Sequence, residues 1–319
     1  MASHKRAARG DCGGPLLGPR SRALTRKPRA VCWGELLWDR FVDADRLGGA
    51  AANVAFHARA LGAETALISC VGDDDLGVRA LEVMRGHGVD VSQVRVDALA
   101  PTGSVQVTLV DGQPRFVMSQ TAAWDRIELT EPARELVREA DVLFYGSLAQ
   151  RTPLAQGALR EALCIDGPLR VCDVNLRPPH VSRAAVELCL RCAHVVKMNE
   201  KERADLDELL GTPDIVATLL DHGVRVVAVT LGERGAELHV PGATLHAAVA
   251  TAMPGGDPVG AGDAFSAVLG LSACLGHSPQ RMLACANRYA AYVAAQPGAM
   301  PPTPGFAKEL LSLARDALD

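Results

Sequence analysis

One glycine-rich stretch of the chain has the composition of an anion site. Residues 255–265 read Gly-Gly-Asp-Pro-Val-Gly-Ala-Gly-Asp-Ala-Phe, and the apolar run over 264–275 predicts a buried helix after them. Small residues before a helix leave its first N–H groups without intrahelical partners, and such groups bind anions. Asp263 falls in the first turn, where a carboxylate would repel an anion. This position favours a base that removes a proton from a hydroxyl attacking a phosphate.

The same residues also have an ordinary structural interpretation. A glycine-rich strand-to-helix turn with Asp263 as a first-turn acid would have this sequence too, and short glycine motifs recur by chance. The choice depends on whether other polar residues are predicted beside this loop.

Polar residues and glycines follow several predicted strands at the point where each strand ends. They are Asp39, Gly48, Gly49 and Asn53 early in the chain, Asp173, Asn175 and Arg177 in its middle, then Asn199, Glu202, Thr230, Gly232 and Gly235, and finally Asp257 and Asp263. Each alone has a structural explanation; Asn199 and Glu202, for example, have the spacing of a helix capping box. Because ligands of parallel sheets bind at the carboxyl ends of the strands, their shared position predicts a ligand site.

Strand and helix signals alternate along most of the chain. An apolar strand is predicted over 30–37, a helix over 50–61 that Gly62 closes, and a second strand over 65–71. The alternation resumes at residue 131 and continues into the C-terminal third. This pattern predicts an α/β fold with a mostly parallel central sheet covered by helices on both faces.

A hairpin interrupts the alternation. Residues 103–110 and 114–118 alternate as strands around Asp111-Gly112, a strong turn signal. A hairpin does not belong in a parallel sheet, so we expect a small β-strand lid built from about 39–48 and 102–120, of the kind that excludes water. We expect residues 30–319 to form a single domain and residues 1–29 to form a disordered basic tail.

Composition excludes several classes of function. The chain has 319 residues, 48% of them hydrophobic, and a net charge of −4. Because 1–29 is strongly basic, the rest is more acidic than the whole and a poor nucleic-acid binder. There is no apolar run of membrane-spanning length and no secretory signal, and nine cysteines show no zinc spacing. We expect a cytoplasmic protein with no nucleic-acid or membrane partner. The tail is interpreted as an extension without a role, in preference to a targeting segment or a nucleic-acid arm.

Two regions of the chain resemble the signature regions of ribokinase-like carbohydrate kinases of the phosphofructokinase B type. The first is Gly-Gly-Ala-Ala-Ala-Asn over 48–53 with Gly-Asp-Asp over 72–74, and the second is 257–265. The resemblance covers about residues 30–304. The segments 34–39, 122–125 and 175–178 are most similar to the fructokinase branch. The resemblance implies a ribokinase-like fold and ATP-dependent phosphorylation of a sugar primary hydroxyl, with fructose as the first choice of sugar.

The resemblance also implies a role for each site residue. Asp263 would be the base, with the N–H groups of Gly260, Ala261 and Gly262 as the anion hole and Arg177 near the phosphates. The sugar would be bound by Asp39, Gly48, Gly49 and Asn53. Magnesium and its waters would be ordered by Asn199 and Glu202, and ATP would be lined by Thr230, Gly232, Gly235 and Asn287. A monovalent cation such as K⁺ would lie by Asp257, the Val259 carbonyl and the loop near Gly298.

Two residues depart from the family pattern. Pro258 stands where Thr is common, and Ala51 stands where the fructokinase branch often has Pro. Pro258 removes an N–H and stiffens the loop, which would weaken the cation site. Neither change touches the base or the anion hole, so we expect an active enzyme.

Several alternatives stay open at this point. The sugar could be ribose or 2-keto-3-deoxygluconate; a nucleoside ranks last, because few aromatic residues are predicted near the lid. A non-catalytic sugar-binding paralogue is the alternative from another class. A P-loop enzyme and a nicotinamide-dependent dehydrogenase are excluded, because the chain has neither glycine motif in place. The resemblance implies a homodimer paired through the lid strands, whose edges over 103–118 would otherwise be exposed.

Overall fold

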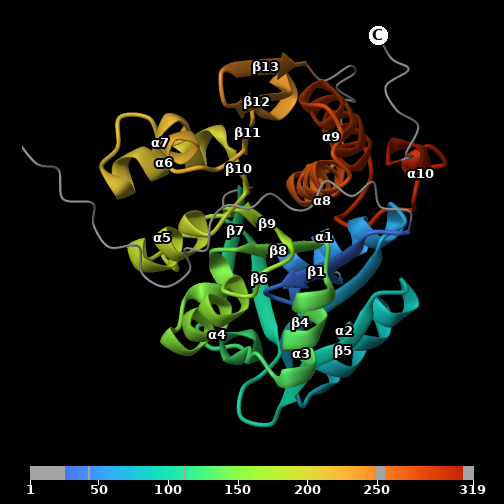
Figure 1. Cartoon of the computed structure of the whole chain (residues 1–319). Helices are drawn as coiled ribbons and strands as arrows, with labels where there is room; N and C mark the ends of the chain where they lie inside the picture. The colour runs from blue at the N-terminus through green and yellow to red at the C-terminus, as the bar shows by residue number, and fades with distance from the viewer. Residues whose placement is uncertain (1–25, 42–43, 111–112, 249–255, 312–319) are drawn as a thin grey trace, which may run out of the picture.

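The computed structural model describes residues 26–41, 44–110, 113–248 and 256–311 (Figure 1). At its centre is a nine-stranded sheet in the order β13-β12-β11-β10-β9-β8-β1-β4-β5. The seven strands from β11 to β5 in this order are parallel, and β12 and β13 are antiparallel additions at one edge. The strands are β1 (Arg29–Trp33), β4 (Glu64–Gly72), β5 (Asp90–Asp97), β8 (Val142–Gly146), β9 (Leu169–Asp173), β10 (Val195–Asn199), β11 (Val226–Thr230), β12 (Ala236–Val240) and β13 (Ala243–Ala247).

Helices cover both faces of this sheet, as the alternation of strands and helices predicts. One face carries α1 (Ala50–Ala60), α2 (Asp75–Gly86), α8 (Ala261–Cys274), α9 (Pro279–Ala294) and the short α10 (Ala307–Leu310). The other carries α3 (Glu131–Glu139), α4 (Pro153–Leu163), α5 (Arg183–Arg191), α6 (Glu200–Leu210) and α7 (Ile215–Asp221). Each face buries its own apolar cluster, so the fold class is confirmed.

The chain reverses direction across the sheet at β1. After β1 it adds β4 and β5 on one side, and it then returns to place β8 against the other side of β1. The connections leave the sheet in opposite directions there, which opens a crevice at the carboxyl ends of the strands.

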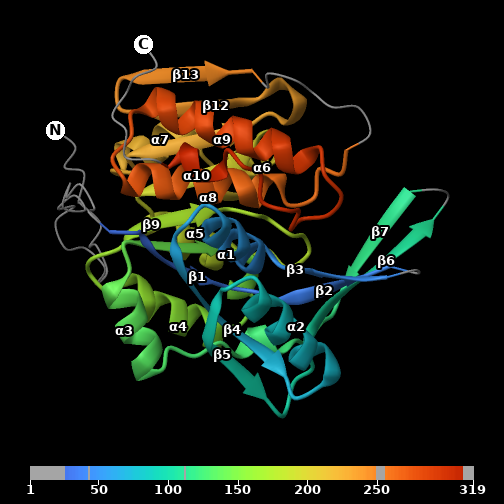
Figure 2. The ribbon, with the colours of Figure 1, turned by 90° about the vertical axis from the view of Figure 1, so that its right-hand side faces the viewer.

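The predicted lid is a second sheet. It has four strands in the order β3-β2-β6-β7 and projects from the body (Figure 2). They are β2 (Leu37–Arg40), β3 (Asp45–Gly48), β6 (Gly103–Val110) and β7 (Gln113–Met118). Trp38 fixes the base of the lid, because its indole N–H donates to the Leu76 carbonyl at 2.9 Å. The Asp111-Gly112 turn lies outside the described residues.

Two boundaries differ from the sequence-based expectation. The apolar run over 30–37 is not one strand: β1 ends at Trp33 and β2 begins at Leu37 in the other sheet. The chain bends at Gly34, where an added Cβ would lie 2.9 Å from the Ala51 Cβ. The folded part also begins earlier than residue 30. Arg26 donates twice to the Asp141 carboxylate, at 2.7 and 2.9 Å, whereas residues 1–25 lie outside the described residues.

Candidate active site

The glycine-rich loop late in the chain and the double glycine early in the chain meet at one point. Asn53 on α1 donates from Nδ2 to Oδ2 of Asp263 on α8 at 2.7 Å, although 210 positions separate the two residues. The other end of the amide, Oδ1 of Asn53, is buried and has no donor among the described residues. This oxygen is an acceptor that a hydroxyl group of a ligand could satisfy.

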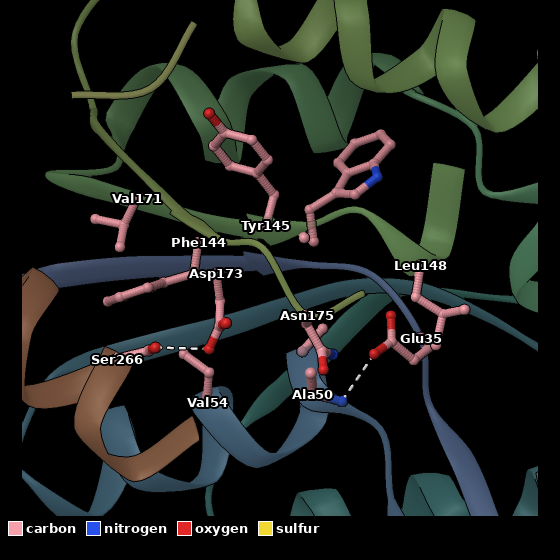
Figure 3. A pocket seen from close by; sticks show the side chains of 13 residues that line it. Glu35, Ala50, Val54, Phe144, Tyr145, Leu148, Val171, Asp173, Asn175 and Ser266 are labelled. Atoms are coloured by element: carbon pink, nitrogen blue, oxygen red, sulfur yellow. Dashed lines mark hydrogen bonds between the residues drawn. The ribbon is translucent and has the colours of Figure 1, made fainter. Parts of the chain in front are cut away.

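The absence of side chains at Gly48 and Gly49 lets the segment before α1 pack closely against residues 35–39. Gly49 has a φ of +102°, and a Cβ there would lie 2.4 Å from the Glu35 carbonyl oxygen. A Cβ on Gly48 would lie 2.7 Å from Oδ2 of Asp39. The Glu35 carboxylate in turn accepts from the N–H of Ala50, the first residue of α1, at 2.9 Å (Figure 3). These contacts place Asp39 and the start of α1 side by side.

The loop before α8 presents unpaired N–H groups. Gly260 has a φ of +80°, and an added Cβ would lie 2.6 Å from the Ala299 Cα. The N–H of Ala261 donates to the Pro258 carbonyl at 3.2 Å, so the turn itself uses one of the three donors expected from the sequence. The N–H groups of Gly260, Gly262 and Asp263 have no acceptor within the described part of the chain. They form an anion-binding helix terminus.

The Asp263 carboxyl titrates near neutrality. Its burial, and then the charge of Asp173, raise its pKa to about 7. The hydrogen bond from Asn53 and the charges of Lys197 and Arg177 act in the opposite direction. A carboxyl with a pKa near the working pH is suited to general-base catalysis.

A buried ion pair behind α8 was not predicted from the sequence. Nζ of Lys197 lies 3.1 Å from both carboxylate oxygens of Asp173, and Oγ of Ser266 donates to the same carboxylate at 2.7 Å. Asp173, Ser266 and Glu35 help to line a pocket at the carboxyl ends of β1, β8 and β9 (Figure 3). Asp173 was expected at the end of a strand, but the only signal for its partner is a lysine inside an otherwise apolar strand.

Arg177 lies among the carboxylates of the site. Its charge acts on Glu35, Asp39 and Asp263, lowering the pKa of each. The guanidinium donates to the Leu176 carbonyl at 3.0 Å and pairs with no carboxylate among the described residues, so it is available to a ligand. Burial outweighs this effect at all three carboxyls: the pKa of Glu35 is raised, that of Asp39 rises to about 6 and that of Asp263 to about 7.

Asn199 and Glu202 form the capping box that begins α6. Asn199 Oδ1 accepts from the Glu202 N–H, and Glu202 Oε2 accepts from the Asn199 N–H, both at 2.8 Å. The other oxygen of Glu202 accepts from the Leu176 N–H at 2.9 Å. Both carboxylate oxygens are therefore engaged, and no cluster of three metal-ligating side chains occurs among the described residues.

The residues expected to line ATP lie around the edge strands of the sheet. Thr230 ends β11, and Gly232 and Gly235 turn the chain into β12. A Cβ on Gly235 would lie 2.0 Å from the Ala247 carbonyl oxygen, and Nδ2 of Asn287 donates to the same oxygen at 2.8 Å. Gly235 and Asn287 therefore converge on the end of β13.

Asp257 links three segments. Its carboxylate accepts from the N–H groups of Val259 and Gly298, each at 3.1 Å, and pairs with Arg46 of lid strand β3 at 3.5 Å. The contact with Arg46 was not expected, and it puts a positive charge beside the carboxylate expected to bind a monovalent cation.

No helix in the described ranges is long and apolar enough to cross a membrane.

Comparison with known proteins agrees with this geometry. The family model for pfkB carbohydrate kinases matches residues 44–305. The chain belongs to this family. It is therefore an ATP-dependent carbohydrate kinase, and the double glycine, the loop before α8 and the lid strands β3, β6 and β7 fall within the matched region.

Curated relatives of this kinase are named for more than one sugar. "Probable fructokinase-3" of Arabidopsis thaliana is 31% identical over 70% of this chain and 67% of its own length. The 2-dehydro-3-deoxygluconokinase of Thermoproteus tenax is 30% identical over 83% of this chain and 85% of its own length. At these identities the two names carry equal weight.

Solved structures of this fold hold the expected ligands. An uncharacterized sugar kinase from Pyrococcus horikoshii in complex with ATP has 26% identity and a TM-score of 0.75, covering 88% of this chain and 99% of that chain. An Escherichia coli structure holds ATP and Mg²⁺ (23% identity, 88% and 96% covered, TM-score 0.74). A Vibrio cholerae fructokinase double mutant holds fructose, ADP and potassium (24%, 89% and 98% covered, TM-score 0.73). The last two likenesses concern the fold alone.

Proposed function

We propose that this kinase transfers the terminal phosphoryl group of ATP to the primary hydroxyl of fructose, with Asp263 as the base. The observation that carries the proposal is the 2.7 Å hydrogen bond between Asn53 and Asp263. It joins the double-glycine region, proposed to bind the sugar, to the helix terminus proposed to bind the phosphoryl group. An acid at the junction of an acceptor site and an anion site has the position that the base requires.

The residues divide the reaction between them. The hydroxyl oxygen attacks the terminal phosphorus, its proton passes to Asp263, and the bond to the oxygen bridging to the second phosphate breaks to release ADP. The N–H groups of Gly260 and Gly262 stabilise the charge on the phosphoryl oxygens as it moves. Asp39 and the free Oδ1 of Asn53 hold sugar hydroxyls, and the lid excludes water.

Asn199 and Glu202 are placed to bind Mg²⁺ only through its water ligands. Mg²⁺ neutralises charge on the phosphates of bound ATP. Because both oxygens of Glu202 already accept N–H groups, Glu202 and Asn199 fit an outer role, reaching waters of an ion that arrives with ATP. Asp257 fits a monovalent cation in part, since Arg46 lies 3.5 Å from one of its oxygens.

The positive charge of the arginines around Asp39 favours a second candidate substrate. Arg177 has no carboxylate partner among the described residues, and Arg46 also acts on Asp39. Two guanidinium groups at the acceptor side suit a sugar acid such as 2-keto-3-deoxygluconate, whose carboxylate would pair with Arg177. Fructose has no such group.

A coupled assay of ADP release decides between these acceptors. Purified enzyme with MgATP is tested against fructose, ribose, 2-keto-3-deoxygluconate and a nucleoside, and Arg177→Gln is tested in parallel. Fructose should give the highest kcat/KM, and Arg177→Gln should change its KM little. A higher kcat/KM for the sugar acid, lost in Arg177→Gln, would replace fructose by the sugar acid. No sugar-dependent turnover with any acceptor would overturn the kinase proposal.

A further inference from the structure

Lys197 is buried directly behind the helix terminus that faces the phosphoryl group. It lies on β10, has 6% of its surface exposed, and its ammonium lies 3.1 Å from both oxygens of Asp173 on β9. Ser266 on α8 donates to the same carboxylate at 2.7 Å (Figure 3). Two neighbouring strands thus hold the second turn of α8 through one carboxylate.

The ammonium also touches the first turn of α8. A Cβ built on Gly262 would lie 2.9 Å from Nζ of Lys197, so the backbone of Gly262 rests against the charge. No other residue fits at 262 unless the lysine moves. The N–H of Gly262 is one of the unpaired donors of the anion site, and its neighbour Asp263 is the proposed base. Lys197 therefore lies behind both groups.

Three carboxylates face this single ammonium. Asp173, Glu202 and Asp263 all act on Lys197, and Asp173 alone is in contact with it. A buried ion pair usually contributes little net stability, because removing two charges from water costs as much as their attraction returns. Net stability alone therefore does not account for a lysine buried at this position.

We propose that Lys197 is a positioning residue for phosphoryl transfer: clamped by Asp173, its ammonium supports the first turn of α8 and keeps a positive charge behind Asp263. The inference rests on the proposed function of Asp263. The chain has no P-loop, whose lysine binds phosphate directly. Here a lysine from another strand lies behind the backbone donors, with its ammonium paired to both oxygens of Asp173.

The two partners of the ion pair have opposite electrostatic effects on the base. The charged groups that act on Asp263 are Asp173 from β9, Lys197 from β10 and Arg177 from the segment after β9, and Asn53 of α1 donates to it. Asp173 raises the pKa of Asp263 and Lys197 lowers it. Lys197→Met should therefore move the acid limb of the pH profile of kcat/KM upward, and Asp173→Asn should move it downward.

The experiment compares these variants with the wild type in the sugar-dependent assay, from pH 5 to 9. For Lys197→Met we expect kcat to fall about 10²-fold, the size of effect that a small misplacement of reacting groups has, with little change in KM for sugar or ATP. Calorimetric binding of ATP and the thermal unfolding midpoint report whether each variant is folded. Lys308→Met, which removes an exposed lysine of α10, is the matched control and should equal the wild type.

Each outcome supports or overturns the inference. Shifts of opposite sign in the two variants support it, because a purely structural ion pair would give no such pattern. A wild-type kcat and pH profile in folded Lys197→Met would overturn it and leave the kinase proposal intact. If Lys197→Met does not fold, the neutral pair Lys197→Met/Asp173→Asn replaces it, and a kcat close to that of the wild type overturns the inference. Absence of sugar-dependent turnover in the wild type would contradict the proposed function instead.

Discussion

At the scale of single residues, the protonation state of Asp263 controls the proposed reaction. Burial and the charge of Asp173 raise its pKa to about 7. A base must be deprotonated, so kcat/KM should fall about tenfold per pH unit below 7 and level off above it. Initial rates at subsaturating sugar, from pH 5 to 9 at constant ionic strength, measure this. A profile flat from pH 5 to 8 would show that another group is the base.

Removal of the Asp263 carboxylate should separate activity from stability. Asp263→Asn keeps the shape and the contact with Asn53 but cannot accept a proton, so kcat should fall by about 10²–10⁴. The folded protein binds the proton of Asp263 more tightly than the unfolded chain, so ionisation costs stability from about pH 4 upward and costs most above pH 7. Asp263→Asn should therefore unfold at a higher temperature than the wild type at pH 8.

The control for this prediction is the same comparison at acidic pH. Below pH 4 the wild-type carboxyl is protonated in both states, so the difference in thermal midpoint should disappear. A variant less stable than the wild type at pH 8 would mean that ionised Asp263 is well solvated in the folded state. That result would weaken its assignment as a perturbed base.

The residues that the sequence could predict are those with a local signal. Asp263 follows three small residues at a helix start, and Asn199 and Glu202 have the capping-box spacing that the structure confirms. Lys197 and Arg46 have no such signal, because their partners Asp173 and Asp257 lie on other segments. Pairings of this kind depend on strand order, which a single sequence does not reveal.

At the scale of elements, α8 depends on how closely its N-terminus approaches the neighbouring loop. Gly260 has a φ of +80° and would place a Cβ 2.6 Å from Ala299. Gly276, just after the same helix, has a φ of +73° but nothing within 4 Å of its Cβ. The two glycines share a left-handed backbone conformation, which would strain any other residue, but they differ in packing.

This difference gives a matched pair of variants. Gly276→Ala should cost about 1 kcal/mol of unfolding free energy, for left-handed strain alone, and leave kcat unchanged. Gly260→Ala adds a backbone clash that displaces the anion donors, so kcat should fall about 10²-fold or more. Chemical denaturation and steady-state kinetics measure both. Equal losses of kcat in the two variants would show that strain, rather than the position of the loop, matters.

Helices and strands could be predicted where the apolar pattern is local. The prediction was ambiguous where one continuous apolar run contributes strands to two different sheets. The run over 30–37 is continuous in hydrophobicity, yet Gly34 to Leu36 carry the chain from the central sheet into the lid. The chain bends at Gly34 where it packs against Ala51 of α1. Because α1 lies later in the chain, the apolar run itself does not indicate the bend. The hairpin over 103–118, by contrast, is confirmed as β6 and β7 of the lid.

At the scale of the whole molecule, an ion pair joins lid strand β3 to the loop before α8. Arg46 on β3 lies 3.5 Å from Asp257, and the same carboxylate holds the N–H of Gly298. The two side chains are 49% and 28% exposed, so their attraction is worth about 1 kcal/mol or less. A monovalent cation at Asp257 would compete with a partner held this weakly.

This competition predicts how the enzyme responds to salt. In Arg46→Gln the positive charge beside Asp257 is gone, so the KCl concentration that gives half-maximal activity should fall relative to the wild type, while choline chloride at equal ionic strength should have no effect. Arg40→Gln, which removes a lid arginine paired with Asp45 instead, is the control and should keep the wild-type response. Arg46 also lowers the pKa of Asp39, so sugar KM is measured in each variant. If the KCl response of Arg46→Gln matches that of both other proteins, Asp257 serves to join the two loops and does not bind a cation that Arg46 displaces.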